Sequence, residues 1–246
     1  MNMSFYTATV GAHQQQERLN VHGNNIANVN TNGFRARIPA FSSLMTGLMK
    51  GIDEDLPRGV GAKLEDAELD FRSTGYADTG RVLDFAIEGE GFFALMEPGS
   101  GEISYTRDGS FTMMEVTLAA EDSDEGETGW YLSDGNGRFV LGADGQIIEV
   151  PTGTTELLGY DFNVGVFDFI NRNGMLSLSE NRLMPVEKNG DVIIGRGKAI
   201  QGVLEQSNAD LAQELAKVIE SQRSFQYLLR MITSSDEIET TVNNLR

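Results

Sequence analysis

Hydrophobic positions are most regular near the end of the chain, between Ser207 and Arg246. This stretch contains no glycine or proline to interrupt a helix. Ser207 to Asp210 is typical of a helix start. Residues spaced by three or four positions then predict one side of a helix, with polar Gln222 among them: Leu211, Leu215, Val218, Gln222, Phe225, Leu229 and Ile232.

After Ile232 the hydrophobic pattern moves to a neighbouring side of this helix, through Met231, Ile238, Val242 and Leu245. A helix of this length would measure about 55 Å. A small domain cannot cover so long an apolar side. The helix therefore needs a partner elsewhere in the chain or on another chain.

A second helical pattern is found between Phe5 and about Asn28. Gly11 and Gly23 each weaken it by about 1 kcal/mol relative to alanine. We expect this weaker helix to become ordered against the C-terminal one. The two ends of the chain are thus predicted to pair as an antiparallel two-helix unit; the alternative is two separate core helices of one globular domain.

The part between the predicted helices favours β structure. Periodicity is poor from Arg35 to about Gly80, and Gly47 to Gly61 is predicted to be an exposed loop or connector. From Val82 onwards, short hydrophobic runs alternate with glycine-containing turns, which predicts an antiparallel β domain. We expect hairpins at Asp108-Gly109, Asp134-Gly135 and Asp144-Gly145.

These patterns predict the α+β class, with long N- and C-terminal helices pairing as a coiled-coil-like unit and an inserted antiparallel all-β domain. The predicted organisation has three parts. They are a terminal helical core domain (1–34 and 205–246), an extended connector or small β region (35–80 and 186–204) and an antiparallel β domain (81–185).

Composition removes several classes of function. The net charge of −18 argues against binding nucleic acid or an anionic membrane surface. The absence of cysteine excludes disulfides and thiolate metal sites, and two histidines make a multi-histidine zinc site improbable. The sequence shows neither a cleavable secretory signal nor a run of ~20 apolar residues that could span a membrane.

Candidate chemical motifs are weak. Gly89 to Ala94 has the letters of a dinucleotide-binding fingerprint, but a strand and not a helix is predicted to follow, so we reject it. The acidic stretch Glu121–Glu127 lacks the glycine and glutamate positions of an EF-hand loop, which favours a solvated loop. We therefore expect no catalytic residue, no metal site, no cofactor and no small-molecule substrate. A hydrolase that uses paired carboxylates remains an alternative, as does a binding module that does not assemble.

Three further stretches are informative together. They are Asn24–Asn28 followed by Thr31–Phe34; Leu83–Ile87 with Gly89, Gly91, Phe92 and Phe93, followed by Tyr105–Phe111; and Gln201–Glu205 followed by Ser207-Asn208 and Ile219–Arg223. In order and spacing they resemble the rod and hook family of axial proteins in the bacterial flagellar basal body. The resemblance covers nearly the whole chain.

This resemblance implies that both terminal helices form the inner core of a helical tube, with the β region further out. It also implies location in the flagellar basal body after export by the type III apparatus without a cleaved signal peptide. The expected partners are copies of the chain itself, other rod and hook subunits, and the export apparatus.

The function predicted in this way is mechanical. A stiff helical assembly would carry torque, and its contacts would lie along the hydrophobic sides of the helices. The predicted interface residues are Leu211, Leu215, Val218, Phe225, Leu229 and Ile232, with Phe5, Leu19 and Ile26 opposite and polar Gln222 fixing the register. For each of them, packing within the chain's own helix pair is the alternative.

Overall fold

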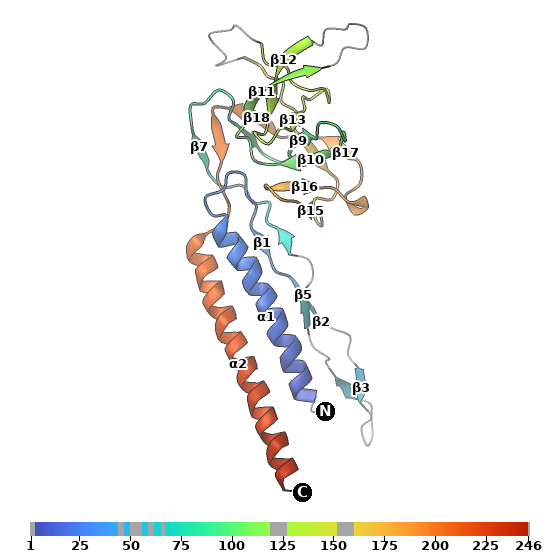
Figure 1. Cartoon of the computed structure of the whole chain (residues 1–246), viewed down its shortest axis with the longest axis vertical. Coiled ribbons are helices and arrows are strands. Elements are labelled where there is room, and N and C mark those ends of the chain that lie inside the picture. Colours follow the sequence, from blue (N-terminus) through green and yellow to red (C-terminus); the bar gives the residue numbers. More distant parts are fainter. Residues whose placement is uncertain are drawn as a thin grey trace. The chain divides into compact units, whose positions relative to one another are not determined.

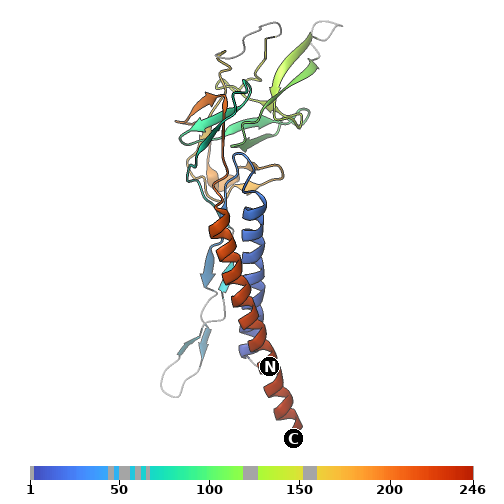
Figure 2. The same ribbon diagram turned by 90° about the vertical axis from the view of Figure 1, so that its left-hand side faces the viewer.

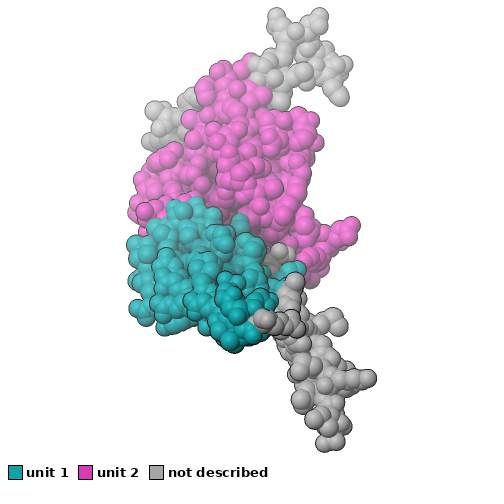
Figure 3. Space-filling view, turned by 60° about the horizontal axis from the view of Figure 1, so that its bottom comes forward, with its two compact units in different colours: residues 1–29, 36–70, 209–246 teal, residues 30–35, 71–208 magenta. Residues whose placement is uncertain are grey.

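The computed structural model describes residues 3–43, 47–49, 56–58, 62–64, 67–118, 127–151 and 160–245. It confirms the α+β class, with a helix near each end and antiparallel strands between them. The chain forms two compact units (Figure 3). Unit 1 comprises Met1–Val29, Ala36–Asp70 and Ala209–Arg246, and unit 2 comprises Asn30–Arg35 and Phe71–Asn208. The chain therefore passes from one unit to the other four times.

Two antiparallel helices form most of unit 1. The helices α1 (Met3–Ala27) and α2 (Leu211–Asn244) lie side by side (Figures 1 and 2). The predicted start of α2 at Ser207 is wrong, because Asp210 caps the helix. Its carboxylate accepts the backbone N–H groups of Ala212 and Gln213, at 2.9 and 3.3 Å.

The rest of unit 1 is a ribbon of short strand pairs, and α1 lies against β1 and β5. All the pairs are antiparallel: β1 (Arg37–Ile38) with β6 (Glu68–Leu69), β2 (Phe41–Ser43) with β5 (Ala62–Leu64), and β3 (Gly47–Met49) with β4 (Leu56–Arg58).

The loop predicted from Gly47 to Gly61 is therefore wrong where β3 and β4 pair; residues 50–55 and 59–61 lie outside the described residues. Pro57 is opposite Leu48 in this pair. Proline is tolerated there because both strands of an isolated pair are edge strands. Strands of two or three residues are too short to show the alternation on which a sequence prediction depends.

Unit 2 contains a seven-stranded antiparallel sheet. Its strand order is β11–β12–β13–β9–β10–β16–β15. These strands are β9 (Phe93–Met96), β10 (Ile103–Thr106), β11 (Thr112–Leu118), β12 (Glu127–Ser133), β13 (Phe139–Val140), β15 (Leu176–Ser177) and β16 (Arg182–Met184).

Three further antiparallel pairs and a short 3-10 helix, η1 (Glu187–Asn189), complete unit 2. The pairs are β8 (Phe85–Glu88) with β18 (Lys198–Gln201), β7 (Tyr76–Asp78) with β19 (Val203–Glu205), and β14 (Phe167–Phe169) with β17 (Val192–Ile194).

The hydrophobic core of unit 2 is rich in aromatic residues. Phe93 is fully buried and meets Phe111 edge to face, with ring centroids 5.2 Å apart. The only tryptophan, Trp130, packs against the same core. The buried cluster consists of Phe85, Ile87, Phe93, Leu95, Phe111, Leu132, Val140, Ile148, Val150, Phe162 and Val166.

The turn predictions had different outcomes. The hairpins at Asp134-Gly135 and Asp144-Gly145 are confirmed, since Ser133 pairs with Phe139 and Leu141 with Ile147. The hairpin at Asp108-Gly109 is wrong, because β10 pairs with β9 and β16 while β11 pairs with β12.

At Gly109 the chain instead passes β8. A Cβ atom at Gly109 would lie 1.8 Å from the Phe85 carbonyl oxygen, so a close backbone approach requires glycine at this position. The same Asp-Gly letters that favour a hairpin elsewhere therefore serve a long-range contact here.

The two rejected motifs also have places in unit 2. Gly89 and Gly91 have positive φ angles and precede β9. A strand therefore follows these glycines, as predicted, where a dinucleotide site would need a helix. Residues 119–126, which include most of the acidic stretch, lie outside the described residues. Glu127 begins β12.

Candidate assembly interface

Small residues on α1 bring the two helices of unit 1 together. Ala8 and Ala12 are buried, and a Cβ atom at Gly11 would lie 3.3 Å from Leu228 Cδ2 on α2. On α2, Ser221 is fully buried and its hydroxyl donates to the Lys217 carbonyl oxygen, at 2.8 Å. Gly11 weakens an isolated helix, but here the missing side chain makes room for Leu228.

A buried polar cluster joins the same two helices. Glu214 on α2 accepts hydrogen bonds from His22 Nδ1 at 2.6 Å, Asn25 Nδ2 at 3.2 Å and Lys217 Nζ at 2.8 Å. The His22, Asn25 and Glu214 side chains are all nearly inaccessible to solvent. The cluster thus places an anchored carboxylate where a simple coiled coil would have a hydrophobic residue.

The electrostatics of this cluster follow from its hydrogen bonds. Burial by itself raises the pKa of Glu214. The hydrogen bonds from Lys217, His22 and Asn25 outweigh that effect, so the pKa lies below its ordinary value of 4.5. Glu214 is therefore ionised at neutral pH, and His22 Nδ1–H is the donor in their contact.

Asn25 also fixes the strand that follows α1 in unit 1. Its side-chain amide donates to the Arg37 carbonyl oxygen and accepts the Arg37 N–H, both at 2.9 Å. A single amide side chain thus contacts α2 through Glu214 and β1 through Arg37. The side chain at this position must both donate and accept hydrogen bonds. An amide can do both, whereas an ionised carboxylate can only accept.

The predicted interface residues separate into two groups. One group is partly buried in the helix pair of the chain: Leu19, Ile26, Val218, Phe225 and Ile232. The other group is exposed: Phe5, Leu211, Leu215, Gln222 and Leu229.

The exposed hydrophobic residues form a stripe on α2. Leu211, Leu215 and Leu229 have between 42% and 47% of their surface exposed, and Ile219 has 52%. Their spacings of four, four and ten residues return to nearly the same side of a helix with 3.6 residues per turn. We call these four residues the α2 stripe. It lies beside the side of α2 that carries Glu214 and Ser221.

More hydrophobic surface is exposed towards the end of α2. The helix has 34 residues and α1 has 25. At ~1.5 Å per residue, α2 is longer by about 14 Å. Its end extends past the described end of α1 (Figures 1 and 2). Ile238, Val242 and Leu245 are exposed there.

In unit 2, a second buried cluster joins the three stretches that carry the family resemblance. Glu205 is flanked by Arg35 Nη2 at 2.6 Å and Arg107 Nη1 at 3.0 Å. Gly33 approaches so closely that a Cβ there would lie 2.3 Å from the Arg107 carbonyl carbon. Its N–H donates to the Glu205 carbonyl oxygen, at 2.8 Å.

Burial lowers the pKa of Arg107, and the adjacent Glu205 carboxylate opposes that effect. Arg107 also donates to the carbonyl oxygens of Ile87 and Gly89, at 3.3 and 2.7 Å. Sequence reasoning missed both clusters. A carboxylate in a polar stretch gives no sign that it is buried, and its partners are far away along the chain.

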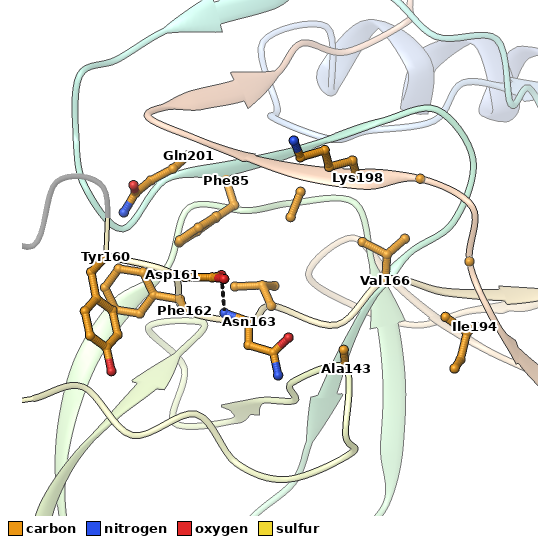
Figure 4. A pocket seen from close by; sticks show the side chains of 14 residues that line it. Phe85, Ala143, Tyr160, Asp161, Phe162, Asn163, Val166, Ile194, Lys198 and Gln201 are labelled. Atoms are coloured by element: carbon orange, nitrogen blue, oxygen red, sulfur yellow. Dashed lines mark hydrogen bonds between the residues drawn. The ribbon is translucent and has the colours of Figure 1, made fainter.

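A cavity of about 320 Å³ opens on unit 2, with Phe85, Phe162 and Val166 among its lining residues (Figure 4). A hydrolase of the kind considered above needs two carboxyl groups in such a place. The described lining includes one, that of Asp161, which accepts the Asn163 N–H at 3.1 Å. Elsewhere, the hydrogen bond from Arg172 holds the pKa of Glu90 below its ordinary value. Burial raises the pKa of Asp168, but its contacts with Arg172 outweigh that effect, so its pKa is also below the ordinary value. These are properties of ion pairs that stabilise a fold.

A helix pair made from distant parts of the chain, with hydrophobic residues left exposed and a β unit inserted between the two helices in the sequence, is typical of a structural protein that assembles. Comparison with known families gives the same class. Residues 5–35 match the model described as flagella basal body rod protein, 86–157 the flagellar hook protein FlgE/F/G D1 domain, and 200–245 the flagellar basal body rod FlgEFG protein C-terminal region.

Whole-length relatives agree. The flagellar basal-body rod protein FlgG of Buchnera aphidicola subsp. Schizaphis graminum is 30% identical, over 98% of this chain and 99% of the relative. FlgG of Bacillus subtilis is 30% identical over 100% of both chains. The rod protein FlgF of Rhizobium meliloti is 32% identical over 96% and 94%.

The chain therefore belongs to the family of flagellar basal-body rod proteins. It is a structural rod subunit of the flagellar basal body, with a role in motility. The resemblance found in the sequence is thereby confirmed. No helix in the described part of the chain is long and apolar enough to cross a membrane.

Proposed function

We propose that copies of this chain assemble into a helical tube in which α1 and α2 form the inner core, and that the tube transmits torque from motor to hook. The observation that carries the proposal is the α2 stripe. Its residues are hydrophobic, regularly spaced and exposed, although they lie beside a well-formed helix pair. Covering them would contribute roughly 25 cal/mol per Å².

The two groups of helix residues have different roles in this proposal. The exposed group contacts neighbouring copies, because its own chain leaves these hydrophobic residues uncovered: Leu211, Leu215, Leu229 and Phe5. The partly buried residues, among them Val218 and Phe225, first hold the helix pair together. Gln222 is exposed, while Ser221 occupies the side that faces α1. Any register that Gln222 sets is therefore set against another copy.

Within the rod we propose the distal part. The stretches Leu83–Phe111 and Gln201–Arg223 look most similar to the distal rod protein, and the proximal rod protein is the next candidate. Similarity to two proteins named FlgG over 98% or more of the chain supports the first choice. Other rod and hook subunits would adjoin this chain at the ends of the tube.

Two further elements belong to the proposal. The chain would reach the rod through the flagellar type III export apparatus. It would act without enzymatic turnover, because torque resistance depends on many simultaneous contacts and on no chemical step.

The experiment is the Leu215→Asp variant, with Leu215→Met as its matched control. Leu215 is about half exposed, so the monomer should melt as the wild type does. In an assembly the new carboxylate would be buried against a neighbour, and we expect assembly to weaken about tenfold or more, with loss of motility. Electron microscopy of isolated basal bodies and swimming assays measure both effects.

The Met control should assemble normally, because it keeps the hydrophobic contact. Phe225→Asp should differ from Leu215→Asp by also lowering the helix content of the monomer, since Phe225 is partly buried in the pair. A Leu215→Asp protein that assembles and supports swimming contradicts the proposed role of the stripe.

A further inference from the structure

Four asparagines of unit 2 are each followed by glycine: Asn32, Asn136, Asn173 and Asn189. Asparagine is a thermolabile residue, and its spontaneous deamidation is fastest before glycine, where no side chain hinders the reacting backbone nitrogen. The reacting pair is the same at all four positions. A difference in their reactivity in the folded chain therefore comes from the fold.

Deamidation makes particular demands on both residues. The backbone nitrogen of the glycine loses its proton to solvent and attacks Cγ of the asparagine. A bond from this nitrogen to Cγ forms, the bond from Cγ to Nδ2 breaks, and ammonia leaves. Water then opens the resulting cyclic imide at either carbonyl, which gives aspartate or isoaspartate. The glycine N–H and the asparagine side chain must therefore be free of other hydrogen bonds.

Two of the four positions do not meet this requirement. The Gly33 N–H, which follows Asn32, donates to the Glu205 carbonyl oxygen at 2.8 Å. Asn189 is fully buried. Its side chain is held at 2.7, 2.7 and 3.1 Å by three backbone groups, the Val186 N–H and the carbonyl oxygens of Asn171 and Asn173. Both positions have to open locally before they react.

Asn173 and Gly174 meet the requirement. Both residues are exposed, in a turn between β14 and β15. Among the described residues, neither the Asn173 side chain nor the Gly174 N–H has a hydrogen-bond partner. Lys188 is adjacent, since a Cβ atom at Gly174 would lie 3.3 Å from Lys188 Nζ. Its positive charge stabilises the anionic nitrogen that attacks and the carboxylate that is produced.

Asn136 is an intermediate case. It is exposed, and the N–H of Gly137 has no partner among the described residues. The Asp134 carboxylate, however, accepts the N–H groups of Asn136 and Arg138, at 2.9 and 3.1 Å. The residues on both sides of Gly137 are thus fixed by one side chain. This hold restricts the movement that brings the Gly137 nitrogen to Cγ.

We propose that Asn173-Gly174 is a site of spontaneous modification, at which the folded chain deamidates while Asn32 and Asn189 are protected. The co-reactant is solvent water, and no enzyme is needed. The inference goes beyond the proposed function and does not depend on assembly, because every contact that carries it lies within unit 2.

The modification has a structural consequence. The Asn173 carbonyl oxygen accepts one of the hydrogen bonds that hold the buried Asn189 side chain. In isoaspartate this carbonyl becomes part of a free carboxylate, and the chain continues through Cγ with one extra carbon atom. Asn189 ends η1, shortly before β17. Isoaspartate should therefore loosen this segment, whereas aspartate keeps the carbonyl in place.

The test measures deamidation of the full chain by peptide mapping and mass spectrometry, in buffer and in guanidinium chloride at the same pH. In denaturant the four positions should react within about threefold of one another. In the folded chain we expect Asn173 to react fastest and Asn136 next. Asn32 and Asn189 should react at least about tenfold more slowly than in denaturant. Equal rates in the folded chain, or a protected Asn173, would overturn the proposal.

Lys188→Gln tests the role of the adjacent charge. We expect deamidation at Asn173 to slow about threefold and that at Asn136 to stay unchanged. Lys198→Gln removes the same charge from β18 and is the matched control. An Asn173 rate that is the same in both variants contradicts the role of Lys188.

Hydrogen exchange tests the consequence. The isoaspartate form, separated by chromatography, should exchange its amides faster over residues 186–194 than the unmodified chain. Asn173→Asp should exchange like the wild type there, because it keeps the carbonyl that Asn189 binds. Equal protection of the isoaspartate form contradicts the coupling to Asn189.

Discussion

The two units bury different kinds of residue. In unit 2, phenylalanine, leucine, isoleucine and valine form one continuous buried cluster. In unit 1, the buried hydrophobic residues among those described are all alanines: Ala8, Ala12, Ala36 and Ala209. The larger hydrophobic residues of its helices are partly or fully exposed. Unit 2 therefore resembles a domain that folds alone, and unit 1 resembles one part of a core that further chains complete.

The largest difference should appear in amide hydrogen exchange of the monomer. We expect residues 1–30 and 210–246 to exchange quickly and the β strands of unit 2 slowly. Opening unit 2 exposes a large core, whereas opening the helix pair exposes alanines, a small polar cluster and side chains that are already partly exposed. The protection factors should differ about 1,000-fold or more, as a difference of ~4 kcal/mol in opening free energy requires. Protected helices in a proven monomer contradict the comparison.

The next largest effect is expected for Phe93→Ala. Phe93 is fully buried against Phe111, so its removal should lower the free energy of unfolding of unit 2 by about 3–5 kcal/mol. Trp130 fluorescence during chemical denaturation measures this loss, since this single tryptophan packs on the unit 2 core. Met113→Ala, at an exposed position, is the control. If the far-UV helix signal falls in parallel, the two units are not independent.

Glu205→Gln should cost about 3 kcal/mol in unit 2. The substitution leaves the buried guanidinium groups of Arg35 and Arg107 without their carboxylate partner. Glu88→Gln, at the exposed last position of β8, is a matched control that removes the same charge. Denaturation followed by Trp130 fluorescence measures both. A loss no larger than that of the control would show that the cluster does not stabilise the unit.

A smaller effect, about 2 kcal/mol, is expected in unit 1 from Glu214. Its pKa is lowered in the folded chain by hydrogen bonds that outweigh burial. Its contribution to stability is therefore present above pH 4.5 and is lost as pH falls through the lowered value. Circular dichroism should show the helix signal decreasing in that acidic range.

Glu214→Gln should reduce the helix signal at pH 7 and make it less dependent on acid. Glu220→Gln, on the exposed side of α2, should titrate like the wild type. An unchanged acid transition in the Glu214 variant would assign that transition to other carboxylates.

Regular, local patterns were sufficient to predict the helices. Nothing interrupts α2 after Asp210, and its hydrophobic spacing predicts a partner. Its start was missed by three residues because Ser207, Asn208 and Asp210 can each cap a helix. Only the structure shows that Asp210 makes the hydrogen bonds. The antiparallel character of the β region was also predictable, from its short runs and turns.

Long-range features could not be predicted in the same way. The turn at Asp108-Gly109 has the letters of a hairpin, but the strand partners of β10 come from elsewhere in the sequence. Glu214 and Glu205 are typical surface residues by composition. Their burial depends on His22, Arg35 and Arg107, which are between 98 and 192 positions away. Leu211, Leu215 and Leu229 of the α2 stripe were predicted from the hydrophobic spacing, whereas Ile219 was not. Only the structure separates these exposed residues from the partly buried ones that hold the helix pair.

The four passages of the chain between the units have a mechanical consequence. Two domains joined by a single linker can rotate freely relative to each other, so the linker transmits a pulling force but no torque. Here four chain segments join the units, after Val29, Arg35, Asp70 and Asn208. Rotating one unit against the other would wind these four segments around each other. The connection therefore resists rotation by covalent topology alone, before any non-covalent contact is counted.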